Sequence, residues 1–551
     1  MIEIIIKKGG YKMLLKSLKK STLLTIVFTL VLTIFTLPLA QSVSAQEANK
    51  LRLTLNTEPP SLDPALATDS TSGAIIRNVF EGLTTLSDGE VAPGVAESWE
   101  LSDDLLTYTF KLREDATWTN GQPVTAHDFE YAWKRVLNPE TASSYASILY
   151  VIDGAKSYNS GEGSEEDVKV AAIDDHTLEV TLTEPCAYFL ELTAFYTYLP
   201  VNKEAVESGN GWAAEAGEQY VTNGPFTMTT WNHNSEVILT KNPTYWDADN
   251  VSLEEVNIQI ITSEATATAE YQAGNLDYLG TPYGTLSLDS IDLFKADGSM
   301  KTEPYAGIYM YKLNTTDELI QNVNLRKALA LAIDRQSLID NILKGNQIPA
   351  LGYVPATIHG FEEDRGYFQD GDFEAAKEYL AKAMEELGLS DPGEITIKLS
   401  INDSEAHMTI AQYVQESWAK NLGIQTEIDS TEWQVYLDRI RDLDYQVGRL
   451  GWIADYNDPN TFLEMYKTAD DGNNNTGWES PDFAEKLTAA TKETDPEKRT
   501  GLLLEAESIM IEDMPVIPVY YYTNNYVVSD HVQNMKPDAL GGILLKDVVV
   551  E

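Results

Sequence analysis

Residues 394–428 restrict the fold more than any other segment, because two kinds of side-chain periodicity follow each other there. The stretch "EITIKLSIN", residues 394–402, alternates apolar and polar residues and predicts a half-buried strand. Apolar residues then recur every three or four positions over residues 407–422, which predicts a helix that ends at Gly423. A second alternating strand follows at residues 424–428. Strand, helix and strand in this order form a βαβ unit, so the C-terminal half contains an α/β domain.

Helix and strand patterns also alternate elsewhere in the chain. The segment "TAHDFEYAWKRVLNP" predicts an amphipathic helix that starts after Thr125, with Asp128 three residues later and Pro139 beyond its end. Near the C-terminus, "VIPVYYYTNNYVV" (residues 516–528) is rich in β-branched and aromatic residues. We expect this run to be a strand that re-enters an earlier sheet.

Length and charge narrow the range of partners. The chain has 551 residues, 43% of them hydrophobic, and a formal charge of −47. This length corresponds to about two to four domain-sized units with a sizeable core. Nucleic acids and anionic lipid surfaces are bound through basic patches, so the acidic balance argues against both. High negative charge helps to keep an exported protein soluble, and adaptation to a salty or alkaline medium is an alternative explanation.

The first 45 residues have the pattern of a cleaved signal peptide. The basic segment "MLLKSLKKS" (13–21) precedes the apolar run "TLLTIVFTLVLTIFTLPLA" (22–40). "SVSA" then ends at Ala45 with small residues at the −3 and −1 positions, so we predict cleavage after Ala45. Translation is expected to start at Met13, because the preceding Lys-Lys-Gly-Gly can be encoded by a purine run that resembles a ribosome-binding site.

An uncleaved membrane anchor is the alternative interpretation of residues 22–40, since a largely apolar run of 19 residues is long enough to span a bilayer. Pro38 and the small-residue cleavage site favour removal. The single cysteine, Cys186, excludes an intramolecular disulfide, so stability must come from burial. No cysteine follows the apolar run to accept an N-terminal lipid.

The sequence contains no common catalytic or metal-binding motif. Its six histidines form no helical metal-binding pair, and it lacks a Gly-x-Ser-x-Gly motif, a glycine-rich phosphate loop and a cysteine cluster. Catalytic triads are assembled in space, so these absences lower the expectation of an enzyme without excluding one. We expect no catalytic residues, no metal site and no cofactor.

The segment "DGNNNTGWESPD" spaces Asp471, Asn473, Asn475 and Asp482 like the ligands of a calcium-binding loop. Thr476 stands where such a loop needs glycine, and the last ligand is aspartate instead of glutamate. We therefore interpret the segment as a polar surface loop.

The segment "RLGWIADYND" (residues 449–458) places an arginine, a glycine, a tryptophan and aspartates within ten positions. One interpretation is a turn, because Asn457, Asp458 and Pro459 are typical turn residues and Asp455 could cap it. The other interpretation is a functional site built on Asp455.

The chain closely resembles the oligopeptide-binding proteins of ABC importers, over nearly its whole length from about Leu51 to Val549. Eight segments carry this resemblance, and they occur in the family's order. They are "EPPSLDP" (58–64), "FEGL" (80–83), "APGVAESWELSDDLLTYTFKLREDATWTNGQPVTAHDF" (92–129), "VTNGPF" (221–226), "NPTYW" (242–246), "NLRKALALAIDR" (324–335), "GWIADYNDP" (451–459) and "PVIPVYYY" (515–522). Each segment alone is weak evidence, but eight in order are specific.

The resemblance implies a two-lobed α/β fold of the periplasmic-binding-protein type (class II) with an additional third domain, and a ligand enclosed in the cleft between the lobes. Strand crossings near Tyr305–Tyr309 and Tyr520–Tyr522 would form the hinge for lobe closure. The implied domains are domain I (46–80, 205–306 and 523–551), domain II (81–204) and domain III (307–522).

A receptor that tolerates many peptide sequences must bind the backbone and the charged ends of its ligand. Adding the peptide as a strand satisfies the backbone, and a desolvated ammonium needs a carboxylate partner. By resemblance, Asp455 is that carboxylate, and the main chain of Gly451 and Ile453 pairs with the peptide. Trp452 and Ala454 belong to the same motif and are expected at the cleft.

On the opposite lobe, the resemblance assigns strand pairing to Thr68, Asp69 and Ser70. Some family members have an acidic residue at the position of Thr68, so we expect its main chain and not its side chain to act.

For the peptide carboxylate, Arg449, His407 and Lys344 match family positions that serve ligands of different length. A further family arginine falls at Ile440 here, and either neighbouring arginine could substitute for it. His407 could alternatively be a structural residue at a helix N-terminus, and Arg449 could form a salt bridge within its lobe.

Four aromatic residues match positions that line the cleft in the family: Trp433, Trp452, Tyr145 and Tyr521. Core packing is the alternative for each of them.

The predicted function is therefore capture of short oligopeptides outside the cytoplasm and their delivery to the permease and ATPase of an ABC importer. We expect a monomer that does not bind nucleic acid. Alternatives are a receptor of the same fold for dipeptides, signalling peptides, haem or a nickel chelate, a peptide-binding chaperone or sensor, and a secreted hydrolase. The lack of a histidine cluster disfavours direct metal coordination.

Overall fold

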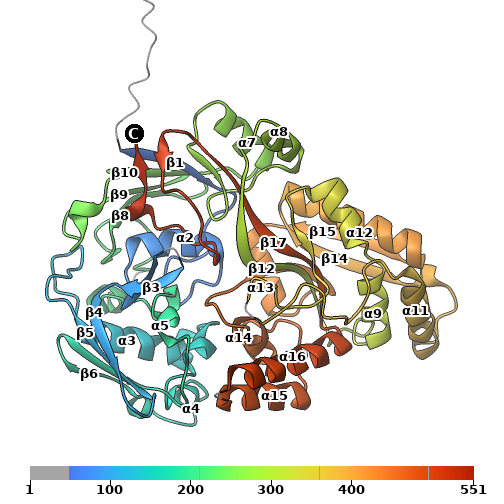
Figure 1. Ribbon diagram of the computed structural model, residues 1–551, viewed down its shortest axis with the longest axis horizontal. Coiled ribbons are helices and arrows are strands. Elements are labelled where there is room, and N and C mark those ends of the chain that lie inside the picture. The colour runs from blue at the N-terminus through green and yellow to red at the C-terminus, as the bar shows by residue number, and fades with distance from the viewer. Residues whose placement is uncertain (1–48, 88, 210, 359, 494) are drawn as a thin grey trace, which may run out of the picture. The chain divides into compact units, whose positions relative to one another are not determined.

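The structure of the protein is a computed structural model, which describes residues 49–87, 89–209, 211–358, 360–493 and 495–551 (Figure 1). The predicted signal peptide and its cleavage site lie outside the described residues. Within the described part of the chain, no helix combines the length and the apolar character that a membrane crossing requires.

A four-stranded sheet contains the first described strand. It consists of β1 (Lys50–Leu55), β8 (Phe226–Asn232), β9 (Glu236–Lys241) and β10 (Glu255–Ile260), in the spatial order β1-β10-β9-β8. β1 runs parallel to β10, and the other neighbours are antiparallel. Leu51 and Leu53 are fully buried, as the alternation of side chains along a strand requires.

A second four-stranded sheet is antiparallel throughout. Its strands are β4 (Ala96–Leu101), β5 (Thr107–Leu112), β6 (Val170–Asp174) and β7 (Thr177–Thr181), in the order β4-β5-β7-β6. Helix α3 (Ala126–Leu137) packs against β6 and β7 and confirms the helix predicted for this segment. The Asp128 carboxylate accepts a hydrogen bond from the backbone N–H of Thr125 at 2.8 Å, which completes the start of the helix.

The third sheet has seven strands and lies at the centre of the structure. They are β11 (Tyr278–Gly280), β12 (Lys301–Leu313), β13 (Ile348–Pro349), β14 (Thr396–Asn402), β15 (Gln425–Thr431), β16 (Val447–Ile453) and β17 (Val516–Val528). The order is β11-β17-β12-β16-β14-β15, and β13 pairs with β17.

The predicted βαβ unit is confirmed. β14 and β15 are parallel neighbours joined by α12 (Glu405–Leu422), which ends at Gly423 with a φ of 75°. The helix starts two residues before the predicted His407, because Ser404 is its N-cap and accepts a hydrogen bond from the His407 backbone N–H. The apolar periodicity therefore predicted the element, and the capping residue determines its boundary.

β12 and β17 are the longest strands, with 13 residues each, and they run side by side (Figure 1). Their antiparallel register shifts between Pro304 and Ile308 and again between Tyr309 and Met310. β17 also pairs with β11, so the strand predicted at residues 516–528 does re-enter an earlier sheet. The irregular stretch falls within the predicted hinge, whose movement stays a prediction.

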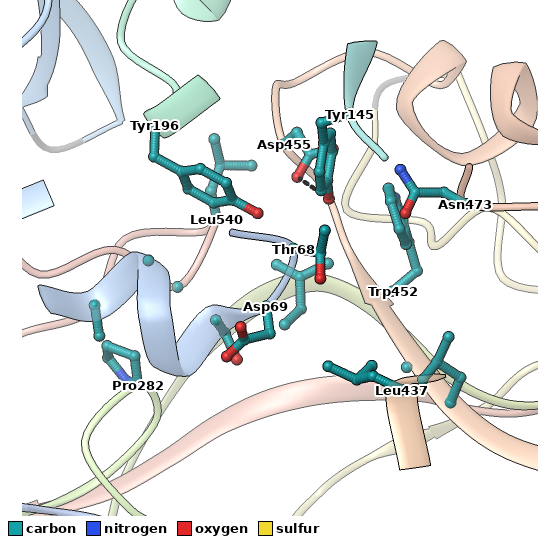
Figure 2. Close-up of a pocket in the computed structure, with 18 of the residues that line it drawn as sticks. Thr68, Asp69, Tyr145, Tyr196, Pro282, Leu437, Trp452, Asp455, Asn473 and Leu540 are labelled. Atoms are coloured by element: carbon teal, nitrogen blue, oxygen red, sulfur yellow. Dashed lines mark hydrogen bonds between the residues drawn. The ribbon is translucent and has the colours of Figure 1, made fainter. Parts of the chain in front are cut away.

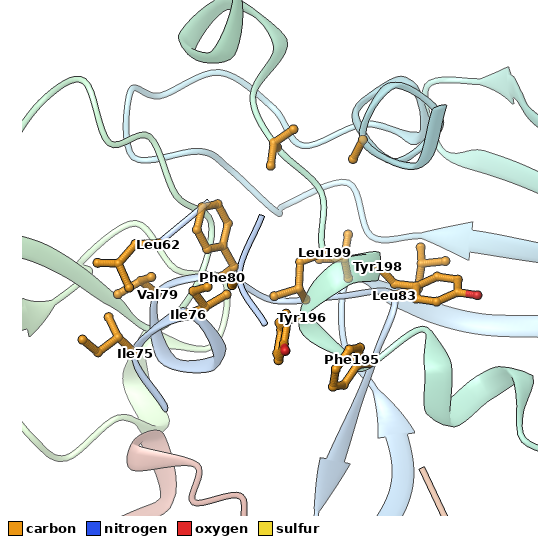
Figure 3. Close-up of a cluster of buried hydrophobic side chains, with 14 of the residues drawn as sticks. Leu62, Ile75, Ile76, Val79, Phe80, Leu83, Phe195, Tyr196, Tyr198 and Leu199 are labelled. Atoms are coloured by element: carbon orange, nitrogen blue, oxygen red, sulfur yellow. The ribbon is translucent and has the colours of Figure 1, made fainter. Parts of the chain in front are cut away.

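Two large clusters of buried apolar side chains form the cores of two lobes. The core of the first lobe draws mainly on residues 51–258 and 526–550, and the core of the second lobe draws mainly on residues 306–521. Figure 3 shows part of the first core, where the apolar face of α2 (Ser70–Val79) lies beside residues 195–199. Trp452 packs against both clusters, so it lies where the two lobes meet.

Two short pairs of strands and twelve further α-helices complete the regular elements named here for the described residues. The strand pairs are β2 (Thr84–Ser87) with β3 (Glu90–Pro93), and β18 (Val532–Gln533) with β19 (Val549–Val550). The helices are α4 (Ala155–Asn159), α5 (Phe189–Leu192), α6 (Lys203–Glu207), α7 (Glu264–Gln272), α8 (Ile291–Ala296), α9 (Val323–Leu331), α10 (Arg335–Leu338), α11 (Phe373–Leu387), α13 (Trp433–Arg441), α14 (Asn460–Leu463), α15 (Pro481–Lys492) and α16 (Pro496–Asp513).

The segment that resembles a calcium-binding loop is not a surface loop. Asn474 and Thr476 are completely buried. The buried ammonium of Lys312 donates hydrogen bonds to the carbonyl oxygens of Asn473, at 2.5 Å, and Asn474, at 3.0 Å. The predicted surface location is therefore wrong. The loop folds inward because a buried ammonium requires polar partners, which the carbonyl oxygens of the loop supply.

Candidate functional site

A cavity of about 210 Å³ lies where segments of both lobes meet. The second lobe contributes residues 449–455, part of α13 and the loop at 472–475, and the first lobe contributes the start of α2, residues 144–145 and 195–196, and residues 540–543. Thr68, Pro282, Tyr305 and Tyr522 also line the cavity. A cavity between lobes is a common place for a small ligand.

Asp455 lines this cavity two positions after the end of β16 (Figure 2). Its backbone N–H donates to the hydroxyl of Thr461 at 3.1 Å, which fixes the local turn. The Tyr145 hydroxyl donates a long hydrogen bond of 3.5 Å to its Oδ1. Burial raises the pKa of Asp455 to about 8, although the charge of Arg77 acts in the opposite direction. Such a carboxylate has unused acceptor capacity for a cationic group.

Asp69 also lines the cavity, but its carboxylate serves its own helix. As the N-cap of α2, it accepts hydrogen bonds from the backbone N–H of Ser72 at 3.0 Å and from the Ser72 hydroxyl at 2.8 Å. Burial raises the pKa of Asp69, and these hydrogen bonds lower it. Figure 2 shows Thr68 between Asp69 and Asp455, and Ser70 lines the same wall.

Arg449 lies on β16 with its guanidinium over the ring of Tyr309, 4.7 Å from the ring centroid. Nη2 donates to the hydroxyl of Tyr522 at 3.1 Å, and Nη1 donates to Oδ1 of Asn402 at 3.3 Å. Among the described residues, its Nε has no hydrogen-bond partner. Because its partners are neutral, the positive charge is available to an anionic group of a ligand.

The strand β16 has an edge that is only partly paired. Its pairing with β12 continues to Ile453, whereas its pairing with β14 includes only Val447 and Gly448. Beyond Gly448, the main chain on the β14 side is therefore open to another partner. Unpaired strand edges of this kind accept an added strand.

Tyr436 marks the point where the β14–β16 ladder ends. Its hydroxyl lies within hydrogen-bond distance of the carbonyl oxygens of Ser400 on β14, at 3.0 Å, and Arg449 on β16, at 2.7 Å. The main-chain groups of alternate residues point to the same side of a strand. Those of Gly451 and Ile453 therefore point, like the Arg449 carbonyl, away from β12, and both residues line the cavity.

The cavity brings together eleven of the fourteen predicted site residues. They are Thr68, Asp69, Ser70, Tyr145, Trp433, Arg449, Gly451, Trp452, Ile453, Ala454 and Asp455. The other three, His407, Lys344 and Tyr521, lie outside its lining.

Tyr521 points away from the cavity, and Tyr522 takes its place. The Tyr521 hydroxyl donates to the carbonyl oxygen of Gly352 at 3.0 Å and accepts from Arg365 at 3.1 Å. Neighbouring residues of a strand face opposite sides, so only one of the two tyrosines can face the cavity.

His407 lies against an aromatic ring, and Lys344 forms an ion pair. The ring of His407 lies 5.6 Å from that of Tyr309, and burial, together with the charge of Arg449, lowers its pKa well below the ordinary value. A neutral imidazole behind Arg449 supports the structural interpretation of His407. The Lys344 ammonium lies 2.5 Å from a carboxylate oxygen of Asp292.

Several lining residues were not predicted, and Arg77 is the most informative of them. Asp69, Gly73 and Arg77 all line the cavity and follow each other at intervals of four positions. Residues four apart share one face of a helix, so the face of α2 that starts at Asp69 could have been predicted as a cavity wall. The Arg77 Nε is buried without a hydrogen-bond partner among the described residues.

The arginine that could replace the family residue at Ile440 is Arg441, which lines the cavity. Arg439 does not line it and pairs with Asp429, with 2.6 Å between Nη1 and Oδ2, while Arg441 pairs with Asp438, with 3.0 Å between Nη1 and Oδ1. Within the described part of the chain, no group of three or more His, Cys, Asp or Glu residues could hold a metal ion.

The sequence matches the family described as bacterial extracellular solute-binding proteins, family 5, over residues 90–474. The oligopeptide-binding protein OppA of Bacillus subtilis (strain 168) is 47% identical over 500 residues, which cover 90% of this chain and 92% of that protein. The solved complex of Haemophilus influenzae OppA with RPPGFSPFR matches with a TM-score of 0.87 and 30% identity, covering 92% of this chain and 99% of that one. The unliganded open form of the periplasmic murein tripeptide-binding protein MppA has the same 30% identity and covers 92% of this chain and 98% of its own, but its TM-score is 0.63. The chain belongs to the bacterial extracellular solute-binding proteins of family 5.

Proposed function

We propose that the protein is the extracytoplasmic substrate-binding component of an ABC importer, which captures short peptides and delivers them to a permease and its ATPase. It carries out no chemistry on the ligand. The names of its relatives support the ligand class, since the Bacillus subtilis relative is an oligopeptide-binding protein and the Haemophilus influenzae relative was solved with a nine-residue peptide. The protein is exported, its signal peptide is removed, and it acts as a monomer.

The observation that carries this proposal is the position of Asp455 at the end of a half-open strand. A peptide that adds to the free edge of β16 would hydrogen bond to the main chain of Gly451 and Ile453. Its ammonium would then lie at the Asp455 carboxylate, which has only the long hydrogen bond from Tyr145 in the described structure. A charge-assisted hydrogen bond in a water-poor cavity is strong, so the amino end sets the register of the peptide.

Arg449 and Arg441 are the groups that would receive the peptide carboxylate. Both line the cavity, and among the described residues the side chain of Arg449 donates hydrogen bonds to neutral groups only. Thr68, Asp69 and Ser70 would face the peptide from the other lobe, while Trp433, Trp452 and Tyr145 form walls around its side chains. Water can fill the remaining space, which suits a receptor that accepts many sequences.

The three sheets support the predicted division into domain I (46–80, 205–306 and 523–551), domain II (81–204) and domain III (307–522). The sheet with β1 uses strands from the first two ranges of domain I, and the sheet with β4 lies within domain II. The seven-stranded sheet continues from domain I into domain III through β12 and β17.

Calorimetric titration of the purified protein with a small library of di- to pentapeptides tests the proposal. Asp455→Ala should weaken binding by about two to four orders of magnitude, corresponding to the 3–5 kcal/mol lost when one partner of a buried ion pair is removed. N-acetylation of the peptide should have a similar effect on the unchanged protein. Glu416→Ala, which removes an exposed carboxylate from α12, is the control and should leave the affinity unchanged. Equal affinity of Asp455→Ala and the unchanged protein would reject the anchor, and absence of binding to the whole library would reject the function.

A further inference from the structure

The N-termini of two helices from different parts of the fold meet away from the cavity. α7 begins at Glu264 and packs beside β11, where its Ala267 joins a small apolar cluster with Leu279. α12 begins at Glu405 and covers β14 and β15 of the second lobe. Each helix therefore starts with a glutamate, and a serine precedes each glutamate as the N-cap.

Glu264 binds the start of the other helix. One carboxylate oxygen accepts a hydrogen bond from the Ser404 hydroxyl at 2.6 Å, and the other accepts from the backbone N–H of Ala406 at 3.2 Å. Only 4% of Glu264 is exposed, so these bonds are largely shielded from water.

Glu405 makes the reciprocal pair of contacts. Its carboxylate oxygens accept from the Ser263 hydroxyl at 2.7 Å and from the backbone N–H of Ala265 at 3.1 Å. Each helix therefore satisfies a free N–H group of the other with its own first side chain. We call the four residues Ser263, Glu264, Ser404 and Glu405 the helix clasp.

The two serines connect the clasp to the helices themselves. Ser263 Oγ accepts from the backbone N–H of Thr266, and Ser404 Oγ accepts from that of His407, both at 3.2 Å. Each hydroxyl thus caps its own helix while donating its proton to the glutamate of the other. A carboxylate is favourable at a helix N-terminus, because free N–H groups and the helix dipole are positive there.

Two neighbouring carboxylates repel each other, so the clasp needs all of its donors. Burial raises the pKa of Glu264, its hydrogen bonds to Ser404 and Ala406 lower it, the charge of Glu405 raises it further, and the charge of Arg449 lowers it. The four donated hydrogen bonds offset this repulsion only when the helix ends are in contact. Separation of the helices would leave two like charges and no partners across the gap.

The arrangement of the lobes resembles that of a liganded relative. At equal sequence identity, the TM-score is 0.87 to the peptide complex of Haemophilus influenzae OppA and 0.63 to the unliganded open form of MppA. The clasp joins α7 to α12. In the strand order of the seven-stranded sheet, α7 lies beside β11 at one end, and α12 covers β14 and β15 at the other end. A movement that separates the two helix ends would break all four contacts together.

We propose that the helix clasp holds the lobes closed and thereby sets the ligand affinity without touching the ligand. None of its four residues lines the cavity. An interaction that exists in just one of two states increases the population of that state. The apparent affinity for the ligand rises with the fraction of protein molecules that are in the tightly binding state. This inference rests on the proposed function, because it assumes that closure accompanies the capture of a solute.

Four variants test the clasp by calorimetry and stopped-flow binding with trialanine as the probe. Glu264→Ala should raise Kd by about tenfold, within the usual range for coupling between distant sites, chiefly through faster dissociation. Glu405→Ala should raise Kd by a smaller factor, since Glu405 is exposed. The double variant should lose less than the product of the two single effects, because the clasp acts as one unit. Glu374→Ala is the matched control: this exposed glutamate lies in the first turn of α11, pairs with Lys377 within that helix and should have no effect.

Small-angle X-ray scattering gives a readout that does not depend on the ligand. The double variant, shown by circular dichroism to be folded, should have a larger radius of gyration than the unchanged protein without ligand. If Glu405→Ala and Glu264→Ala keep the original Kd and dissociation rate while Asp455→Ala loses binding, the clasp is rejected and the proposed function stands. If the unchanged protein binds no peptide, the proposed function fails, and equal scattering of the double variant and the unchanged protein would then reject the clasp as well.

Discussion

The guanidinium of Arg449 on β16 donates a hydrogen bond across β12 to the hydroxyl of Tyr522 on β17. The two strands that flank β12 therefore position the arginine together. Glycines make this contact feasible. A Cβ atom at Gly451 would lie 2.4 Å from the Tyr522 hydroxyl, and one at Gly307 would lie 2.8 Å from Cδ2 of the same ring. The aromatic ring therefore lies over two strands that have no side chains at the points of closest approach.

Replacement of Arg449 should remove the preference for a free peptide carboxylate. We expect Arg449→Met to weaken binding of a free-acid tripeptide by about a hundredfold, as for a buried charge that loses its partner. The C-terminally amidated form of the same tripeptide should bind the two proteins almost equally. Calorimetry with both peptides measures this difference.

The control for this prediction is Arg439→Met, because Arg439 pairs with Asp429 and does not line the cavity. Loss of the acid preference in the control, or an equal loss for both peptides in Arg449→Met, would contradict the role of Arg449.

A side chain at Gly451 should impair binding more than folding. Gly451→Ala would push the Tyr522 hydroxyl away from Arg449, because the added Cβ would approach it to 2.4 Å. We expect Kd for a bound tripeptide to rise by about tenfold or more, with a loss of about 1–3 kcal/mol in the free energy of unfolding from overpacking.

Gly501→Ala is a useful comparison, since Gly501 lies within α16 and an added Cβ would meet nothing within 4 Å. This change should raise the free energy of unfolding by about 0.5–1 kcal/mol and leave Kd unaltered. Urea unfolding with parallel calorimetry distinguishes the two glycines, and an unchanged Kd in Gly451→Ala would show that the position of Tyr522 does not matter.

Asp455 should make the ligand-free protein sensitive to pH. Burial raises the pKa of this carboxyl group to about 8, so the folded chain holds the proton more tightly than the unfolded chain does. The stability that this group contributes is therefore complete below the ordinary pKa of about 4 and is lost progressively as the pH rises to the folded-state value of about 8. We expect this group to lower Tm from about pH 4 to about pH 8, and a saturating peptide, whose ammonium compensates the charge, to reduce this fall.

The Asp455→Asn variant isolates this contribution from that of other buried acids such as Glu81, whose pKa burial raises to about 7. Thermal unfolding of both proteins over the same pH range gives the comparison. A Tm difference between them that does not change with pH would contradict the assignment.

The two adjacent tyrosines of β17 should separate binding from stability. Tyr521→Phe removes hydrogen bonds to Gly352 and Arg365 outside the cavity, so it should cost about 1 kcal/mol of stability and leave Kd unchanged. Tyr522→Phe removes the partner of Arg449 and should raise Kd by several-fold. Opposite results for the pair, measured by urea unfolding and calorimetry, would mean that Tyr521 serves the ligand.

Local sequence patterns were sufficient for several regular elements of both lobes, although none of these lines the cavity. The alternation and periodicity of residues 394–428 predicted β14, α12 and β15, and Thr125 with Asp128 predicted the start of α3. These signals act over a few residues, where side-chain spacing and capping determine the backbone. The resemblance identified the Asp455 motif as a binding site. Local periodicity alone cannot decide whether this motif is a turn or a functional site.

Properties that depend on distant contacts could not be predicted in this way. The choice between Tyr521 and Tyr522 depends on which face of β17 meets the cavity. Lys344 forms an ion pair with Asp292, which lies far from it in the sequence. The burial of Asn474 depends on Lys312, an amine far away in the sequence. Such contacts leave no periodic signal near the residue that they affect.

The connectivity of the first lobe has a consequence for synthesis of the chain. Leu51 of β1 shares its core with Leu545 and Val550, and β11 pairs with the end of β17. A chain that is made from its N-terminus cannot complete this core until its last residues have been added. The order of the strands itself therefore postpones completion of the lobe that is synthesised first until residues 526–550 are present.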